Sequence, residues 1–133
     1  MSLENVQNLR LALDAFNRGD RAGWLALCDP ELENVPITDW PESDPIRGRE
    51  AVWNFYVEAD DVWEGGTWEY GDLIEAENDK VVANLRREVR GKESGASVAW
   101  SQWQVATFRN GKALRLDWFA DRSEALEAAG LSG

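Results

Sequence analysis

Apolar residues recur along this chain at two spacings, one typical of helices and one typical of strands. Over residues 3–17 they stand three or four positions apart, which predicts a helix that ends before Gly19. Asp20 is suited to cap a second, short helix that continues through Leu27. The helical spacing returns over Arg49–Val62, where we expect a third helix.

Alternating apolar and polar residues predict the strands. A short strand is expected at Leu32–Ile37, where Pro36 favours an edge or a bend. Longer strands are expected over Thr67–Ala76 and Lys80–Arg90, with a turn at Asn78–Asp79 between them. Beyond them, two alternating arms flank Asn110–Gly111, and Asn-Gly between such arms is the strongest short-range signal of a hairpin.

The order of these elements predicts an α+β fold in one domain, residues 1–133. Three helices and a short strand precede four antiparallel strands, and a short C-terminal helix follows with Asp121 as its cap. Arms of about ten residues form a strongly twisted sheet that curls. We therefore expect a curved antiparallel sheet whose concave side is filled by helices, side chains or a ligand.

The parity of the alternation predicts which side chains face the concave side. On the strand Lys80–Arg90, the odd-numbered positions form the more apolar face, and this face includes Leu85 and Arg87. A charge such as that of Arg87 among aliphatic neighbours requires a partner or water. On the last two strands the even-numbered positions are expected inside: Trp100, Gln102, Gln104, Ala106, Leu114, Leu116, Trp118 and Ala120. Trp103, of opposite parity, is expected on an outer face available for dimerisation.

The amino-acid composition argues against several classes of function. The net charge of -11 opposes binding to nucleic acid or to anionic membranes, because both need clustered Lys and Arg. No apolar run approaches a membrane span, and the N-terminus lacks a signal-peptide core, so a cytoplasmic setting is expected. The chain has no histidine, which removes the commonest acid/base residue and zinc ligand. No metal or cofactor is therefore expected.

The segment Thr38–Gly48 is expected to be a loop, with two prolines following Trp40, and a loop over a cavity can act as a lid. Its acids Asp39, Glu42 and Asp44 fit a solvated surface better than a general base.

Three stretches together resemble the SnoaL-like family of the nuclear transport factor 2-like (NTF2-like) superfamily. They are Phe16–Asp20 after the first helix, Ile46–Val52 at the start of the third, and Phe108–Lys112 with its continuation Asp121–Leu131. The resemblance implies a cone-shaped fold, in which the curved antiparallel sheet wraps around the N-terminal helices and leaves a pocket at its open end. It also implies, frequently, a homodimer formed through the sheet. The superfamily contains isomerases, cyclases, hydrolases and non-catalytic binders, so the fold alone does not identify the function.

The chain lacks the catalytic residues used by the enzymes of the superfamily that it resembles. The positions used by ketosteroid isomerases correspond to Ala12, Asn34 and Gln104, and the Asp-Arg-Asp triad of limonene epoxide hydrolases corresponds to Leu85, Arg87 and Trp118. SnoaL-type cyclases use an Asp near a His. Here Asp117 is expected to face outward, and there is no His.

The remaining hypothesis is a binding site for a small apolar or acidic organic ligand inside the cone, with catalysis undecided. Its expected ligand-binding residues are Phe16, Asn34, Trp53, Tyr56, Leu85, Arg87, Trp100, Gln102, Gln104 and Trp118. Arg87 either anchors a ligand or pairs with an acid such as Asp72 or Asp14, and the two Gln side chains either orient a ligand or satisfy backbone groups. The alternative is a non-catalytic dimerisation or protein-interaction module, for which a cone plugged by Trp side chains is expected.

Overall fold

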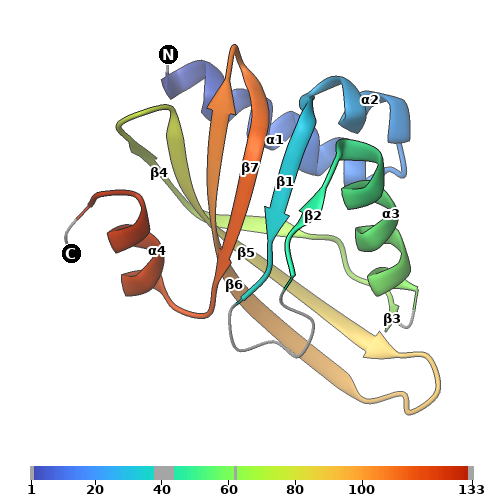
Figure 1. Ribbon diagram of the computed structural model, residues 1–133. Helices are drawn as coiled ribbons and strands as arrows, with labels where there is room; N and C mark the ends of the chain where they lie inside the picture. The colour runs from blue at the N-terminus through green and yellow to red at the C-terminus, as the bar shows by residue number, and fades with distance from the viewer. Residues whose placement is uncertain (1, 38–43, 62, 132–133) are drawn as a thin grey trace.

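The computed structural model describes residues 2–37, 44–61 and 63–131 as helices on a curved sheet (Figure 1). The helices match the predicted order, with bounds α1 Ser2–Asn17, α2 Arg21–Ala26, α3 Arg49–Asp60 and α4 Arg122–Ala128. Asp20 and Asp121 cap α2 and α4, because their side chains accept hydrogen bonds from Gly23 N and Glu124 N. Both N-caps therefore lie where the sequence predicts them.

The sheet has seven strands in the described part of the chain, and it is mixed rather than purely antiparallel. Their bounds are β1 Cys28–Val35, β2 Ile46–Arg47, β3 Trp63–Glu64, β4 Glu69–Ala76, β5 Lys80–Gly91, β6 Ser97–Arg109 and β7 Lys112–Phe119. The order is β2-β1-β7-β6-β5-β3, and β4 also pairs with β5. The strands β4 to β7 pair antiparallel as expected, but β1 pairs parallel with β7. This pairing brings β1 from the expected edge into the sheet, beside the last strand.

Both predicted turns adopt the backbone that their residues favour. Asn110 and Gly111 have φ angles of 53° and 78°, and Asn78 and Asp79 have angles of 61° and 59°. Two successive residues with positive φ characterise the turn that matches the twist of paired strands. These turns explain why the hairpins β4–β5 and β6–β7 can be read from local sequence.

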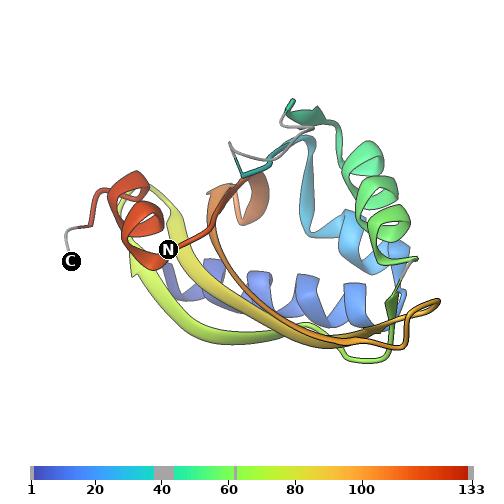
Figure 2. The same cartoon turned by 90° about the horizontal axis from the view of Figure 1, so that it is seen from below.

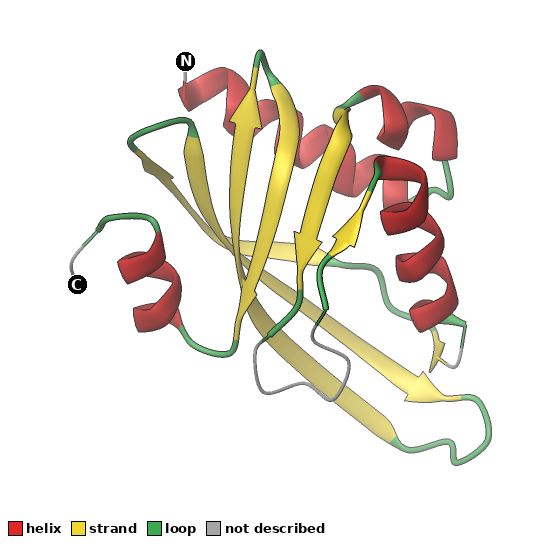
Figure 3. Cartoon of the chain, in the orientation of Figure 1, coloured by secondary structure: helices red, strands yellow, loops and turns green. Residues whose placement is uncertain are grey.

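The helix α1 runs across the concave face of the sheet, and α3 stands at the other side of the opening (Figures 2 and 3). Side chains of α1 such as Leu9 and Ala15 share one core cluster with Val81, Ala83 and Ala106 of the sheet. The odd-numbered face of β5 therefore looks inward, as predicted. Helix α1 therefore covers the inner face of the sheet.

A second cluster lies on the opposite face of the sheet. Ala125, Leu126 and Ala129 near the C-terminus pack on Val82 and Val105. Trp103 packs against the same cluster, and the Arg122 guanidinium lies 5.9 Å from its ring centroid. Trp103, predicted on a dimer face, thus has partners within its own chain, and the homodimer itself stays a prediction.

The predicted parity fails in β7. Thr107 pairs with Arg115 while Phe108 pairs with Ala113, so Leu114 is an extra residue in the ladder. Ala113 and Leu116 consequently both join the inner core, whereas Leu114 belongs to neither cluster. Ala120 lies beyond the end of β7 and is exposed. The expectation that Leu114 and Ala120 face inward is therefore wrong.

Candidate functional site

A cavity of about 520 Å³ lies between the concave face of the sheet and the helices. Its wall combines aliphatic residues of α1 with aromatic residues from α2, α3 and the strands. Small-molecule sites commonly have volumes of about 300–1,000 Å³ and walls that are mainly apolar with a few polar groups. The inside of the cone is thus open and of a size suited to a small organic molecule.

Nine of the ten residues expected in the site line this cavity: Phe16, Asn34, Tyr56, Leu85, Arg87, Trp100, Gln102, Gln104 and Trp118. Trp53 does not. Its ring lies behind the wall, with centroid distances of 5.4 Å to both Phe16 and Trp24. Trp53 is 7% exposed and belongs to the core, where it supports two cavity residues.

Several cavity residues were not predicted, and two of them change its chemistry. Asp60 stands one helical turn after Tyr56, so the i, i+4 spacing of α3 could have placed both on the same face. Trp68 precedes β4, and its backbone N and O are both hydrogen-bonded by the Asn17 side chain, at 3.0 and 2.9 Å. No local pattern indicates this anchor, since the two residues lie far apart in the sequence.

Asn34 is the centre of a hydrogen-bonded group on the cavity wall. It is 1% exposed, and its Oδ1 accepts hydrogen bonds from Tyr56 OH and, at 2.8 Å, from Trp118 Nε1. Trp118 Nε1 also lies 3.3 Å from the Tyr56 oxygen. The parallel pairing of β1 with β7 brings Asn34 beside Leu116, two residues from Trp118. This unpredicted pairing is what assembles the group.

The two tyrosines at the cavity remain neutral. Burial raises the pKa of Tyr56 well above its ordinary range, and burial has the same effect on the pKa of Tyr70. The Tyr70 hydroxyl donates to Leu9 O at 3.2 Å. Both phenols therefore act as hydrogen-bond donors to protein groups and are poorly suited to act as bases.

Arg87 is paired, with a partner other than those expected. Its Nη1 donates to Asp60 Oδ1, instead of reaching Asp72 or Asp14. The Trp68 ring centroid lies 5.4 Å from the guanidinium carbon, within the range of a cation–π contact. Arg87 Nε is buried without a hydrogen-bond partner among the described residues. Arg87 thus lines the cavity as half of an ion pair rather than as a free cation.

The Gln104 amide oxygen does not satisfy a backbone N–H group of any described residue, which was the alternative to orienting a ligand. Gln104 is 4% exposed, and its Oε1 is buried with no hydrogen-bond partner in the described part of the chain. Gln102 lies two residues away on the same face of β6 and also lines the cavity. A buried amide oxygen without a donor is costly. Gln104 lines the cavity, while protein atoms cover its Oε1.

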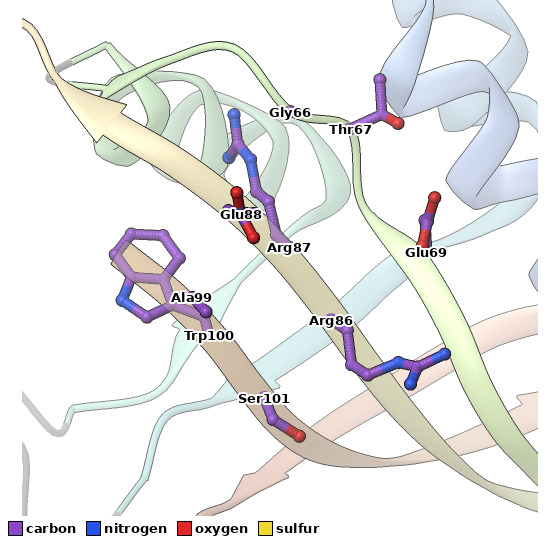
Figure 4. A pocket seen from close by; sticks show the side chains of 9 residues that line it. All are labelled: Gly66, Thr67, Glu69, Arg86, Arg87, Glu88, Ala99, Trp100 and Ser101. Atoms are coloured by element: carbon purple, nitrogen blue, oxygen red, sulfur yellow. The ribbon is translucent and has the colours of Figure 1, made fainter. Parts of the chain in front are cut away.

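A second hollow, of about 610 Å³, lies at the edge of β5. Figure 4 shows its lining of Arg86, Glu88, Glu69 and neighbouring residues, with Gly66 close to β5. A side chain at Gly66 would collide with Glu88 O, because a Cβ built there lies only 1.9 Å from that oxygen. The hollow shares Arg87 and Trp100 with the cavity, but four of its nine lining residues are charged, whereas the cavity is lined mainly by apolar residues. We therefore place the candidate site in the cone.

Two further expectations concern the rest of the chain. Asp39 and Glu42 of the predicted lid lie outside the described residues, while Asp44 is exposed and absent from the cavity wall. Among the described residues, no helix is long and apolar enough to span a membrane. Within the same ranges, no group of three or more Cys, Asp and Glu is arranged to hold a metal.

Comparisons with known proteins agree with this architecture. The chain is similar to a candidate SnoaL-like polyketide cyclase from Jannaschia sp. CCS1 (17% identity, 96% and 92% of the two chains covered, TM-score 0.78). It is similar to TerC, co-crystallized with polyporic acid (22%, 95% and 97%, 0.74). It is also similar to a hypothetical protein with a ketosteroid isomerase-like fold from Catenulispora acidiphila DSM 44928, in complex with trimethylamine (14%, 93% and 92%, 0.71).

The structural likeness concerns the fold, because the sequence identities are low. No relative is found among the curated proteins. The SnoaL-like domain family, in contrast, matches residues 9–116, from α1 into β7. The chain therefore belongs to the SnoaL-like family and has its NTF2-like fold.

Proposed function

We propose that this protein binds a small, mainly apolar organic molecule inside the cone. The observation that carries the proposal is the cavity of about 520 Å³, whose mainly apolar wall includes Gln102 and Gln104. Aromatic and aliphatic side chains supply the apolar contact, and the amides of Gln102 and Gln104 supply polar contacts that orient the ligand. The bound molecules of two proteins with this fold, polyporic acid and trimethylamine, support a ligand-binding role.

The alternative of a dimerisation or interaction module is less well supported. It predicts a cone filled by Trp side chains, whereas Trp100 and Trp118 line an open cavity. Trp103, the expected dimer contact, packs against the cluster around α4.

A thermal-shift screen tests the proposal. A ligand that binds only the native state raises the unfolding midpoint with its concentration. We expect bicyclic aromatic alcohols such as 2-naphthol to raise the midpoint of the wild type, and to raise that of Gln104→Leu much less. A midpoint unchanged by every aromatic alcohol, ketone and acid in the screen would contradict the proposal.

A further inference from the structure

Asp60 and Arg87 are the two charged side chains in the described wall of the cavity. The Arg87 side chain is 6% exposed, and that of Asp60, its ion-pair partner at the end of α3, is 36% exposed. Their charges cancel, so the wall offers no net charge to a ligand. Without Asp60, the same wall would hold one buried, uncompensated cation.

Asp60 is the only residue in the described part of the chain that forms an ion pair with Arg87. The face of the guanidinium lies toward the Trp68 ring, and Trp68 in turn stacks on Trp100 with centroids 6.1 Å apart. Trp63 packs edge-on against Trp100, at 4.7 Å. Of these three Trp rings, Trp68 gives Arg87 its cation–π contact, and Trp100 and Trp63 continue the aromatic group away from it.

We propose that Asp60 determines the charge specificity of the cavity: by neutralising Arg87, it makes the site selective for uncharged ligands over carboxylates. This inference rests on the binding function proposed above. A carboxylate entering the cavity loses its hydration and meets no free positive charge. The net charge of -11 opposes its approach as well.

The experiment compares two probes of nearly the same shape, 2-naphthol and 2-naphthoate, by isothermal titration calorimetry at neutral pH. The wild type is expected to bind 2-naphthol more tightly. Asp60→Asn keeps the shape of the side chain and removes its charge, so its affinity for 2-naphthoate should rise by about tenfold or more. The readout is the ratio of the 2-naphthoate affinity to the 2-naphthol affinity within each variant, and this ratio should rise in Asp60→Asn.

Asp61→Asn is the matched control, because it makes the same change in net charge one residue away. Its side chain is 84% exposed and lies 3.6 Å from Lys92 rather than beside Arg87. We expect no gain of 2-naphthoate binding in this variant. In the double variant Asp60→Asn with Arg87→Met, the gain should disappear. Asp60→Ala serves as a second test of the lost charge, and circular dichroism checks that each variant is folded.

The outcomes separate this inference from the function on which it rests. If the wild type binds 2-naphthol, but 2-naphthoate equally well, the role of Asp60 is wrong and the binding function stands. The same holds if Asp60→Asn and Asp60→Ala gain no more than Asp61→Asn. If neither probe binds the wild type or any variant, both the function and the inference are contradicted.

Discussion

Trp118 Nε1 donates a hydrogen bond to Asn34 Oδ1 at 2.8 Å, from a strand that pairs with the Asn34 strand in parallel. The same oxygen accepts from Tyr56 OH, so one amide joins β1, β7 and α3 at the cavity wall. An acceptor shared by two buried donors holds both rings in place. The shape of the cavity at this side therefore depends on Asn34.

Replacing Asn34 with Leu should destabilise the protein by about 2–4 kcal/mol, because the partly buried Tyr56 and Trp118 would lose the oxygen that accepts from both. Tyr56→Phe should cost less, since it removes one donor and leaves the Trp118 bond to Asn34 in place. Urea unfolding curves of the two variants measure the difference. Equal losses, or a negligible loss for Asn34→Leu, would show that the shared oxygen contributes little.

Replacing Gln104 with Leu should have opposite effects on stability and on binding. In the empty protein it removes a buried oxygen without a partner, so the free energy of unfolding should rise by about 1 kcal/mol. Ligand affinity should fall, because the amide is the polar contact offered to the ligand. Gln102→Leu is the control, since Gln102 is only partly buried and should change stability less. A large stability loss in Gln104→Leu would indicate that the amide is satisfied in the empty protein.

Stability should fall steeply at alkaline pH. Tyr56 and Tyr70 are the only two tyrosines of the chain, and burial raises the pKa of both above the unfolded value of about 10. Burial, partly offset by Arg49, also raises the pKa of the Cys28 thiol to about 12. As pH rises past the unfolded pKa values, the unfolded state releases these protons first. Each group then lowers stability by up to about 1.4 kcal/mol per pH unit.

Tyrosinate absorbance followed together with circular dichroism checks this expectation. Both tyrosines should ionise only as the secondary structure is lost. A titration with a midpoint near the ordinary value for tyrosine, while the circular dichroism stays native, would contradict it.

The second core on the outer face should contribute substantially to stability. Leu126 of α4 is 5% exposed and packs against Val82 and Val105, so Leu126→Ala should cost about 2–5 kcal/mol. The neighbouring exposed Glu127→Ala should be nearly neutral. Chemical denaturation measures both. A loss below 1 kcal/mol, roughly, for Leu126→Ala would mean that α4 is only loosely attached.

Sequence patterns were sufficient wherever local rules determine the structure. The hairpin turns follow from Asn-Gly and Asn-Asp, and the inward parity of Arg87 and Gln104 holds because β5 and β6 pair from Lys80 to Arg90 without a register shift. In β7 the extra residue Leu114 interrupts the alternation of inward-facing and outward-facing side chains. Parity cannot reveal such a bulge, since it assumes an unbroken ladder.

Long-range contacts are the second kind of feature that the sequence patterns could not predict. The parallel pairing of β1 with β7 and the Arg87–Asp60 ion pair join distant segments, and neither has a local signal. Trp53 lies in the core and not on the cavity wall for a related reason. Helical spacing identifies the buried side of α3, but not the boundary between its core and cavity parts.

Calorimetric titration of 2-naphthol into the wild type and into Ala12→Phe tests the central claim most directly. Ala12 lines the cavity from α1, so a Phe ring at this position would fill part of the space proposed for the ligand. We expect saturable one-to-one binding by the wild type, and binding weakened by about tenfold or more in the variant, with an unchanged circular dichroism spectrum. Absence of saturable binding by the wild type, or equal binding by the folded variant, would contradict a binding site inside the cone.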